Sequence, residues 1–178
     1  MNRWIVAIDQ GSHGLSSRVL PETLAQWEQQ TGLQLPPDYR SFLLQHDGGR
    51  PYPNLFRHTV PDSGDGEAVI DHFLDRCYGW QFLQDWRAQL ADRLPERMLV
   101  IGADPGLIEI VLSLREQDHG AIYSWVRNPA PWGSADNLYL CPQAASFTEF
   151  FVSLGDDEER NGYEYWYMPM KHPSVVRL

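Results

Sequence analysis

Five acidic side chains form the densest chemically active group in the sequence, within fourteen residues of one another: Asp62, Asp65, Glu67, Asp71 and Asp75. No lysine or arginine lies between Arg57 and Arg76. Such a run can be a solvated loop that keeps the protein soluble, or an electronegative surface that attracts lysine and arginine side chains of another molecule. The residues by themselves leave both interpretations open.

The side chains that usually perform catalysis or bind metals are scattered. The six histidines show neither an HExxH motif nor paired metal-ligand spacing, and neither Cys77 nor Cys141 lies in a CxxC motif. Asp71 and His72 could be a base with its orienting carboxylate, but adjacent residues of a strand point to opposite faces. The sequence therefore predicts no catalytic site, no metal and no cofactor. A hydrolase with a carboxylate or histidine site is the alternative if two acidic groups meet in space.

The composition excludes several classes of partner. The chain has 178 residues, a net charge of −10 and 43% hydrophobic residues, which is enough for one self-sufficient domain over residues 1–178. The charge is uneven, since residues 61–120 carry 12 acidic against 5 basic side chains, net −7. Carboxylates repel phosphates, so nucleic acid and anionic membranes are not expected partners. With no apolar run near ~20 residues and no signal-peptide pattern, the expected location is cytoplasmic.

Helical spacing dominates the first half of the chain. Residues 21–31 are expected to form a helix that ends at Gly32, and a second helix is expected to open at Pro36 and Pro37 and to end at the glycine pair 48–49. Residues 51–66 read as a loop with at most short edge strands. The pattern of residues 68–74 fits a strand or a helix, and residues 80–90 are expected to be helical.

The second half is rich in strands. Residues 98–101 form a short apolar run, residues 108–115 alternate in the manner of a half-buried strand, and residues 120–126 are expected to pair antiparallel with them through a turn at 116–119. Ser146 and Glu149 form a capping box that opens a final helix. Helices, then strands, then a helix predict an α+β fold in which helices cover one side of a mostly antiparallel sheet.

Several segments, taken in chain order, resemble one known family. They are Leu35-Pro-Pro-Asp-Tyr39 with Phe42-Leu-Leu44 and Asp47-Gly-Gly49, then Ile101-Gly-Ala-Asp-Pro-Gly106, Ile108-Glu-Ile-Val-Leu112, Ile122-Tyr-Ser-Trp125 and Ser146-Phe-Thr-Glu-Phe-Phe151. Together they are similar to the SMI1/KNR4 family, also called the SUKH superfamily. The resemblance covers residues 20–155 and leaves 1–19 and 156–178 as variable extensions.

This resemblance implies an α+β domain without catalysis. Bacterial members of the family are mostly immunity proteins that neutralise toxins, many of them nucleases, by direct binding. Fungal members act as regulatory scaffolds, which leaves a scaffold that binds several partners as an alternative. The motif residues of the family are chiefly structural, because they cap helices and turn the chain.

The resemblance favours an electronegative binding surface over a merely solvated loop. We therefore expect the protein to bind a basic protein, such as a toxin, and no small-molecule substrate. Aromatic side chains often supply the energy of such interfaces, and Trp132 lies in a proline-rich loop where we expect it to be exposed. The expected binding residues are Asp62, Asp65, Glu67, Asp71 and Asp75, with Asp104 and Glu109 as second choices and Trp132 as an apolar anchor.

Overall fold

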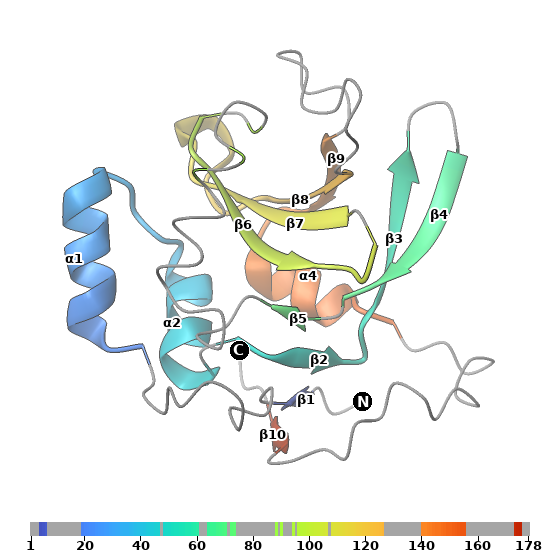
Figure 1. Ribbon diagram of the computed structural model, residues 1–178, viewed down its shortest axis with the longest axis horizontal. Coiled ribbons are helices and arrows are strands. Elements are labelled where there is room, and N and C mark those ends of the chain that lie inside the picture. Colours follow the sequence, from blue (N-terminus) through green and yellow to red (C-terminus); the bar gives the residue numbers. More distant parts are fainter. Residues whose placement is uncertain are drawn as a thin grey trace.

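In the computed structural model, the described residues are 4–6, 19–46, 48–60, 64–70, 72–73, 88, 90, 94, 96–106, 108–126, 140–155 and 173–175. Two helices come first, α1 (Pro21–Thr31) and α2 (Pro37–His46), where the sequence predicts them (Figure 1). Gly32 adopts a φ of 67° and receives the end of α1, a left-handed conformation that glycine adopts without steric cost. None of the described helices is long and apolar enough to cross a lipid bilayer.

A five-stranded antiparallel sheet forms the centre of the fold. Its strands are β5 (His72–Phe73), β6 (Met98–Ala103), β7 (Ile108–Ser113), β8 (Ile122–Val126) and β9 (Leu140–Ala144), hydrogen-bonded in that order. The short 3₁₀ helix η2 (Glu116–Asp118) joins β7 to β8, which confirms the predicted turn. The order of elements confirms the predicted α+β fold.

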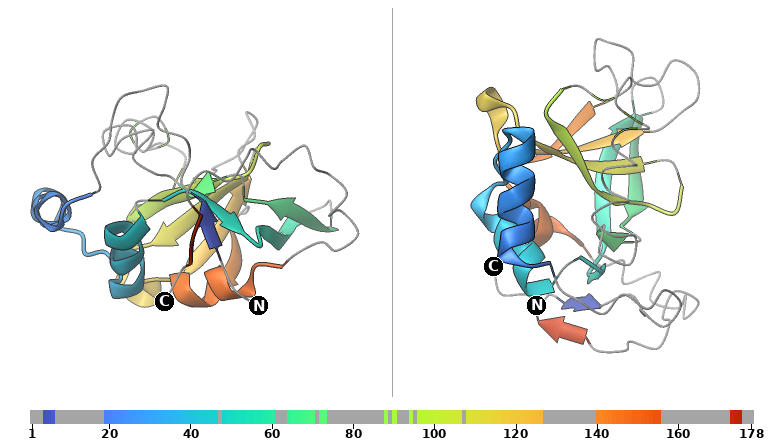
Figure 2. Two further views of the ribbon diagram at one scale, coloured as in Figure 1. Left: turned by 90° about the horizontal axis from the view of Figure 1, so that it is seen from below. Right: turned by 60° about the vertical axis from the view of Figure 1, so that its left-hand side comes forward.

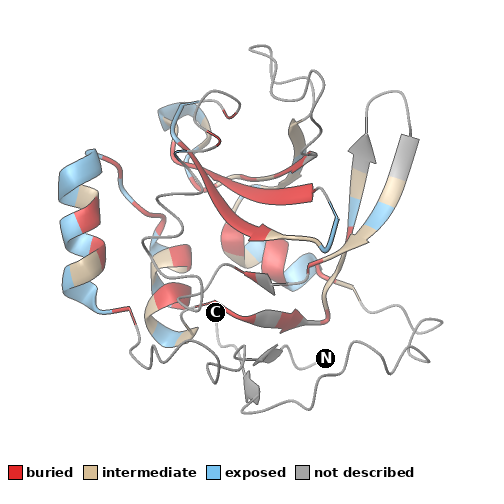
Figure 3. Ribbon diagram, in the orientation of Figure 1, coloured by how far each residue is buried: buried red, intermediate tan, exposed pale blue. Residues whose placement is uncertain are grey.

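Both faces of the sheet are buried along β7, so the prediction of a half-buried strand over residues 108–115 is wrong. The alternation itself is real, because Ile108, Ile110 and Leu112 belong to the main core. The intervening face carries Val111, which packs in a second cluster with Leu90, Leu94, Met98, Val100 and Trp125. All six residues of β7 are consequently buried (Figure 3).

The main core lies between the sheet and the helices. Helix α4 (Phe147–Ser153) begins with the predicted cap, in which Glu149 N donates to Ser146 Oγ and Ala145 N donates to Glu149 Oε2. Figure 2 shows α2 and α4 on one side of the sheet. Aromatic rings from these two helices and from β5 fill the space between them, namely Tyr39, Phe42, Phe73, Phe147 and Phe151.

Residues 55–60 and 64–69 form two paired strands, although residues 51–66 were predicted to be a loop with at most short edge strands. Strands β3 (Leu55–Val60) and β4 (Gly64–Val69) pair over six residues each. Proline and glycine suggested a loop, but the prolines at 51 and 53 precede β3. Gly64 and Gly66 lie in β4, which pairs with β3 alone among the described strands, and glycine is tolerated in such a strand. Of the ambiguous residues 68–74, Ala68 and Val69 lie in β4, and His72 and Phe73 form β5.

A small antiparallel sheet brings together segments from the two ends of the chain. Strand β1 (Trp4–Val6) lies between β2 (Arg50–Tyr52) and β10 (Pro173–Val175). Gly49, directly before β2, forms an antiparallel bridge with Phe73, with N···O distances of 3.1 and 2.8 Å. This bridge links the small sheet to β5. The predicted helix over residues 80–90 lies mostly outside the described residues, among which Ala88 and Leu90 are helical.

Candidate protein-binding surface

The β3–β4 hairpin carries the centre of the acidic run. Figures 1 and 2 show it on the side of the molecule opposite α1. Glu67 is exposed on β4 and lies directly opposite Arg57 of β3, with Oε1 3.4 Å from Arg57 Nε. The Arg57 side chain is 86% exposed and that of Glu67 41%, so water screens the pair and either group can exchange it for another ion.

The other face of the hairpin is attached to the body of the protein. Phe56 is buried, and its ring meets Phe150 of α4 edge-on at 6.1 Å. The His58 ring lies over Gly66, since a Cβ on that glycine would come within 3.1 Å of His58 Nε2. Leu55 also exchanges two backbone hydrogen bonds with Gly155, at 2.8 and 2.9 Å. The hairpin is thus held along one face and at its base, and it presents the Glu67 face to solvent.

Several of the predicted binding residues cannot be placed. Asp62, Asp71, Asp75 and Trp132 lie outside the described residues, and of Asp65 the structure describes the strand backbone alone.

Asp104 has a structural role in the turn between β6 and β7. Its Oδ1 accepts hydrogen bonds from the N–H groups of Gly106 and Ile108, at 2.9 and 2.8 Å. The half-buried carboxylate holds the chain in the tight turn that follows β6. An aspartate two residues before a glycine in a predicted turn is the usual signal for this arrangement.

The expectation for Glu109 is wrong. This residue is only 3% exposed and lies in the middle of the sheet, where its register partners are Ala103 and Trp125. The alternating pattern predicted that Glu109 would face solvent. In the structure, the second core cluster, which includes Val111, covers this face of β7. Glu109 therefore contributes nothing to an accessible surface.

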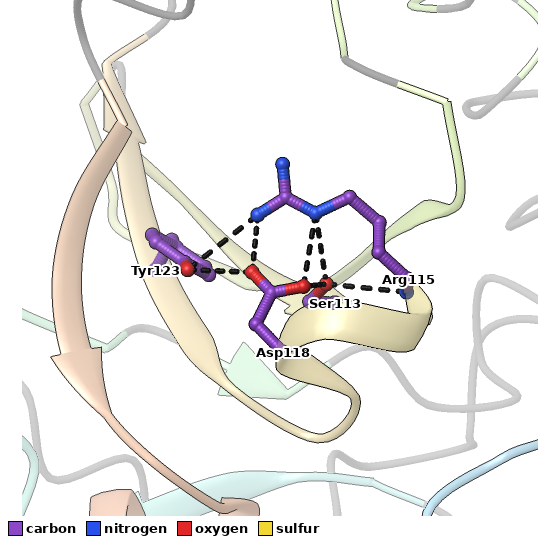
Figure 4. A network of polar contacts seen from close by, with 4 residues as sticks. All are labelled: Ser113, Arg115, Asp118 and Tyr123. Atoms are coloured by element: carbon purple, nitrogen blue, oxygen red, sulfur yellow. Dashed lines mark hydrogen bonds and ion pairs between the residues drawn. The ribbon is translucent and has the colours of Figure 1, made fainter.

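Sequence reasoning missed a polar cluster at the β7–β8 turn. Figure 4 shows Asp118 at its centre, with hydrogen bonds from Ser113 Oγ at 2.6 Å, Tyr123 Oη at 2.6 Å and Arg115 Nε at 3.0 Å, and with an ion pair to Arg115 Nη2. Arg115 also lies over the Tyr123 ring, 5.7 Å from its centre. The signal was present, because Ser113 and Arg115 share one face of the predicted strand and Asp118 lies in the predicted turn.

The electrostatics of this cluster do not suit catalysis. Burial, the largest single influence, would raise the pKa of Asp118, but hydrogen bonds from Arg115, Ser113 and Tyr123 outweigh it and lower that pKa to about 2. A carboxylate with so low a pKa is a weak base. The Ser113 hydroxyl donates its hydrogen bond directly to Asp118, with no histidine between them to take up the proton. Ser113 is also fully buried. The cluster fastens the turn between two strands.

Across the described residues, no three histidine, cysteine, aspartate or glutamate side chains gather in a way that could hold a metal ion. Comparison with known families then places the chain. The model of the SMI1/KNR4 family (SUKH-1) matches residues 18–153, which is most of the sequence. The chain belongs to the SMI1/KNR4 family. No curated protein matches it.

Members of the SMI1/KNR4 family are generally immunity proteins rather than enzymes. The matched residues include the helices α1, α2 and α4, the central sheet and the whole β3–β4 hairpin. Strands β1 and β10 lie outside the match and join it through β2. The acidic run, residues 62–75, is therefore part of the SMI1/KNR4 domain and not of the segments on either side of it.

Proposed function

We propose that this protein is an immunity protein that neutralises a basic bacterial toxin by direct, non-enzymatic binding through the acidic face of its β3–β4 hairpin. The observation that carries the proposal is the exposure of Glu67 on β4. Glu67 belongs to a stretch of fourteen residues, 62–75, that contains five acidic side chains and no lysine or arginine. Membership of a family made mainly of immunity proteins supports the same role.

The charge of this face suits a partner that binds phosphates. A nuclease concentrates lysine and arginine where it holds nucleic acid, and carboxylates can occupy the same positions as phosphates. Complementary charge accelerates association to ~10⁸–10⁹ M⁻¹s⁻¹ at low salt, and an interface of this class buries about 800 Å² on each partner. Asp62, Asp65, Glu67, Asp71 and Asp75 are the proposed contacts, with Trp132 as an apolar anchor. Asp104, which holds a turn, is a secondary contact.

The direct test uses the toxin encoded by the neighbouring reading frame. Co-expression should yield one stoichiometric complex, and adding the purified protein should abolish the toxin's activity in vitro. Recovery of several substoichiometric partners and no inhibition would favour a regulatory scaffold. Turnover of a substrate by the protein alone would contradict a non-enzymatic role.

Charge reversal tests which face binds. Substituting Asp62, Asp65 and Glu67 with lysine should slow association with the toxin by about tenfold at low salt and flatten its salt dependence, because the steering field is removed. The matched control reverses three acids elsewhere, Glu22, Glu96 and Glu116, which are exposed and give the same net charge. Stopped-flow association at several salt concentrations measures both variants. Equal slowing of the two would show that net charge, and not this face, steers the toxin.

A further inference from the structure

We infer that the partner docks by adding an extended, basic segment as a third strand to the outer edge of β4. This inference rests on the proposed function and gives it a binding mode. Within the described part of the chain, β3 is the only strand hydrogen-bonded to β4. The opposite edge of β4 can therefore supply a row of backbone donors and acceptors, as in other proteins that bind a peptide by strand addition.

The register shows which backbone groups form that row. Opposite residues of an antiparallel pair alternate between those that exchange N–H···O bonds and those that do not. Ile70 N donates to Asn54 O at 2.8 Å, which makes these two a hydrogen-bonded pair in line with the β3–β4 register. Counting back in steps of two, the residues whose N–H and C=O groups point away from β3 are Asp65, Glu67 and Val69.

The base of the hairpin confirms this assignment. By the same count, the backbone groups of Leu55 point away from β4. Leu55 N donates to Gly155 O at 2.9 Å, and Gly155 N donates to Leu55 O at 2.8 Å, on the side away from β4. The outer edge of β3 is thus partly occupied by the chain itself, which leaves the edge of β4 as the available one.

The acidic residues of β4 determine which kind of strand can pair with its outer edge. Two of the three outward-facing residues are acidic, and the run from Asp62 to Asp75 contains no lysine or arginine. A second copy of β4 would bring like charges together, which discourages self-association at an open edge. A strand with lysine or arginine at alternate positions would instead gain an ion pair for each acidic residue it passes. A basic extended segment of the toxin is therefore the occupant that fits.

The test separates backbone pairing from charge at one position. Glu67→Pro removes an outward-facing N–H, and its ring occupies the place of the incoming strand, whereas the bonds between β3 and β4 do not use this N–H. Glu67→Ala is the matched control, because it removes the same carboxylate and the ion pair with Arg57 but keeps the N–H. Each full-length variant is titrated against the toxin domain encoded by the neighbouring reading frame, and its melting temperature is measured.

We expect Glu67→Pro to weaken binding by about tenfold or more and Glu67→Ala by at most about threefold. Hydrogen–deuterium exchange of the wild-type complex supplies a second readout that needs no variant. The amides of residues 65, 67 and 69 should become protected on binding, while those of residues 66 and 68, already bonded to β3, should change little.

The outcomes are distinguishable. A complex that forms without protection of these alternate amides, or that tolerates proline as well as alanine, overturns strand addition and leaves the proposed function intact. Absence of any complex with the toxin overturns the proposed function, and strand addition falls with it.

Discussion

Replacing Phe42 with alanine is expected to lower the free energy of unfolding by about 3–5 kcal/mol. The side chain is completely buried, and its ring lies within 4.8–6.3 Å of the rings of Tyr39, Phe73, Phe147 and Phe151. These rings come from two helices and a strand, so a cavity here loosens α2, α4 and β5 together. Urea denaturation followed by fluorescence measures the change.

Val152→Ala is the control for this variant. Val152 lies on α4 close in sequence to Phe147 and Phe151, but it is 51% exposed. Its truncation should change the free energy of unfolding by no more than about 0.5 kcal/mol. A similar loss for both variants would mean that the aromatic cluster is not the centre of the core.

Replacing Asp118 with asparagine should cost about 2–3 kcal/mol of stability at neutral pH. Arg115, with its side chain 21% exposed, would keep its charge and lose its carboxylate. Ser113 and Tyr123 donate to different oxygens of Asp118, so one of the two hydroxyls would face an amide NH₂ group in place of an acceptor. Glu116→Gln is the matched control on the same turn, because its side chain is 94% exposed and its only ion pair described, with Arg97, spans 3.7 Å. Thermal and urea unfolding of both variants measure the difference.

The same cluster gives the wild-type protein a specific acid sensitivity. The pKa of Asp118 lies at about 2 in the folded protein against 3.8 ordinarily, so its contribution is present above pH 3.8 and is lost as the pH falls toward 2. The difference corresponds to about 2 kcal/mol. Asp118→Asn should lack this part of the decline between pH 4 and 2, whereas Glu116→Gln should retain it. A decline of equal size in all three proteins would contradict the assignment.

Local signals were sufficient for the helices and for most of the central sheet. Gly32, the proline at the start of α2 and the Ser146 cap each act within one helical turn, so their effect is visible in the sequence. The hairpin was missed because its stability comes from distant contacts, Phe56 with Phe150 and Leu55 with Gly155. The burial of Glu109 was missed for the same reason, since Leu90 and Leu94 cover its face of the sheet from elsewhere in the chain.

The sequence predicted which acidic residues form the candidate site, but not how they are arranged in space. The acidic run was evident, but its pattern did not show that Glu67 would lie on a strand opposite Arg57. The occupation of the outer edge of β3 by the chain itself depends on how Gly155 meets Leu55, a pairing between residues 100 positions apart. Ser113 and Arg115 lie within five residues of Asp118, but Tyr123 completes the cluster only when β8 pairs with β7.

The position of β1 in the middle of its small sheet matters for anyone who trims the chain. A fragment cut to residues 18–153 would keep every residue that matches the family but would carry β2 without β1 and β10. The bare side of β2 would then offer unsatisfied amides and carbonyls to a neighbouring molecule, a familiar origin of aggregation. The fragment is therefore expected to aggregate more readily than the longer chain, in which β1 pairs with that side of β2 and β10 pairs with β1.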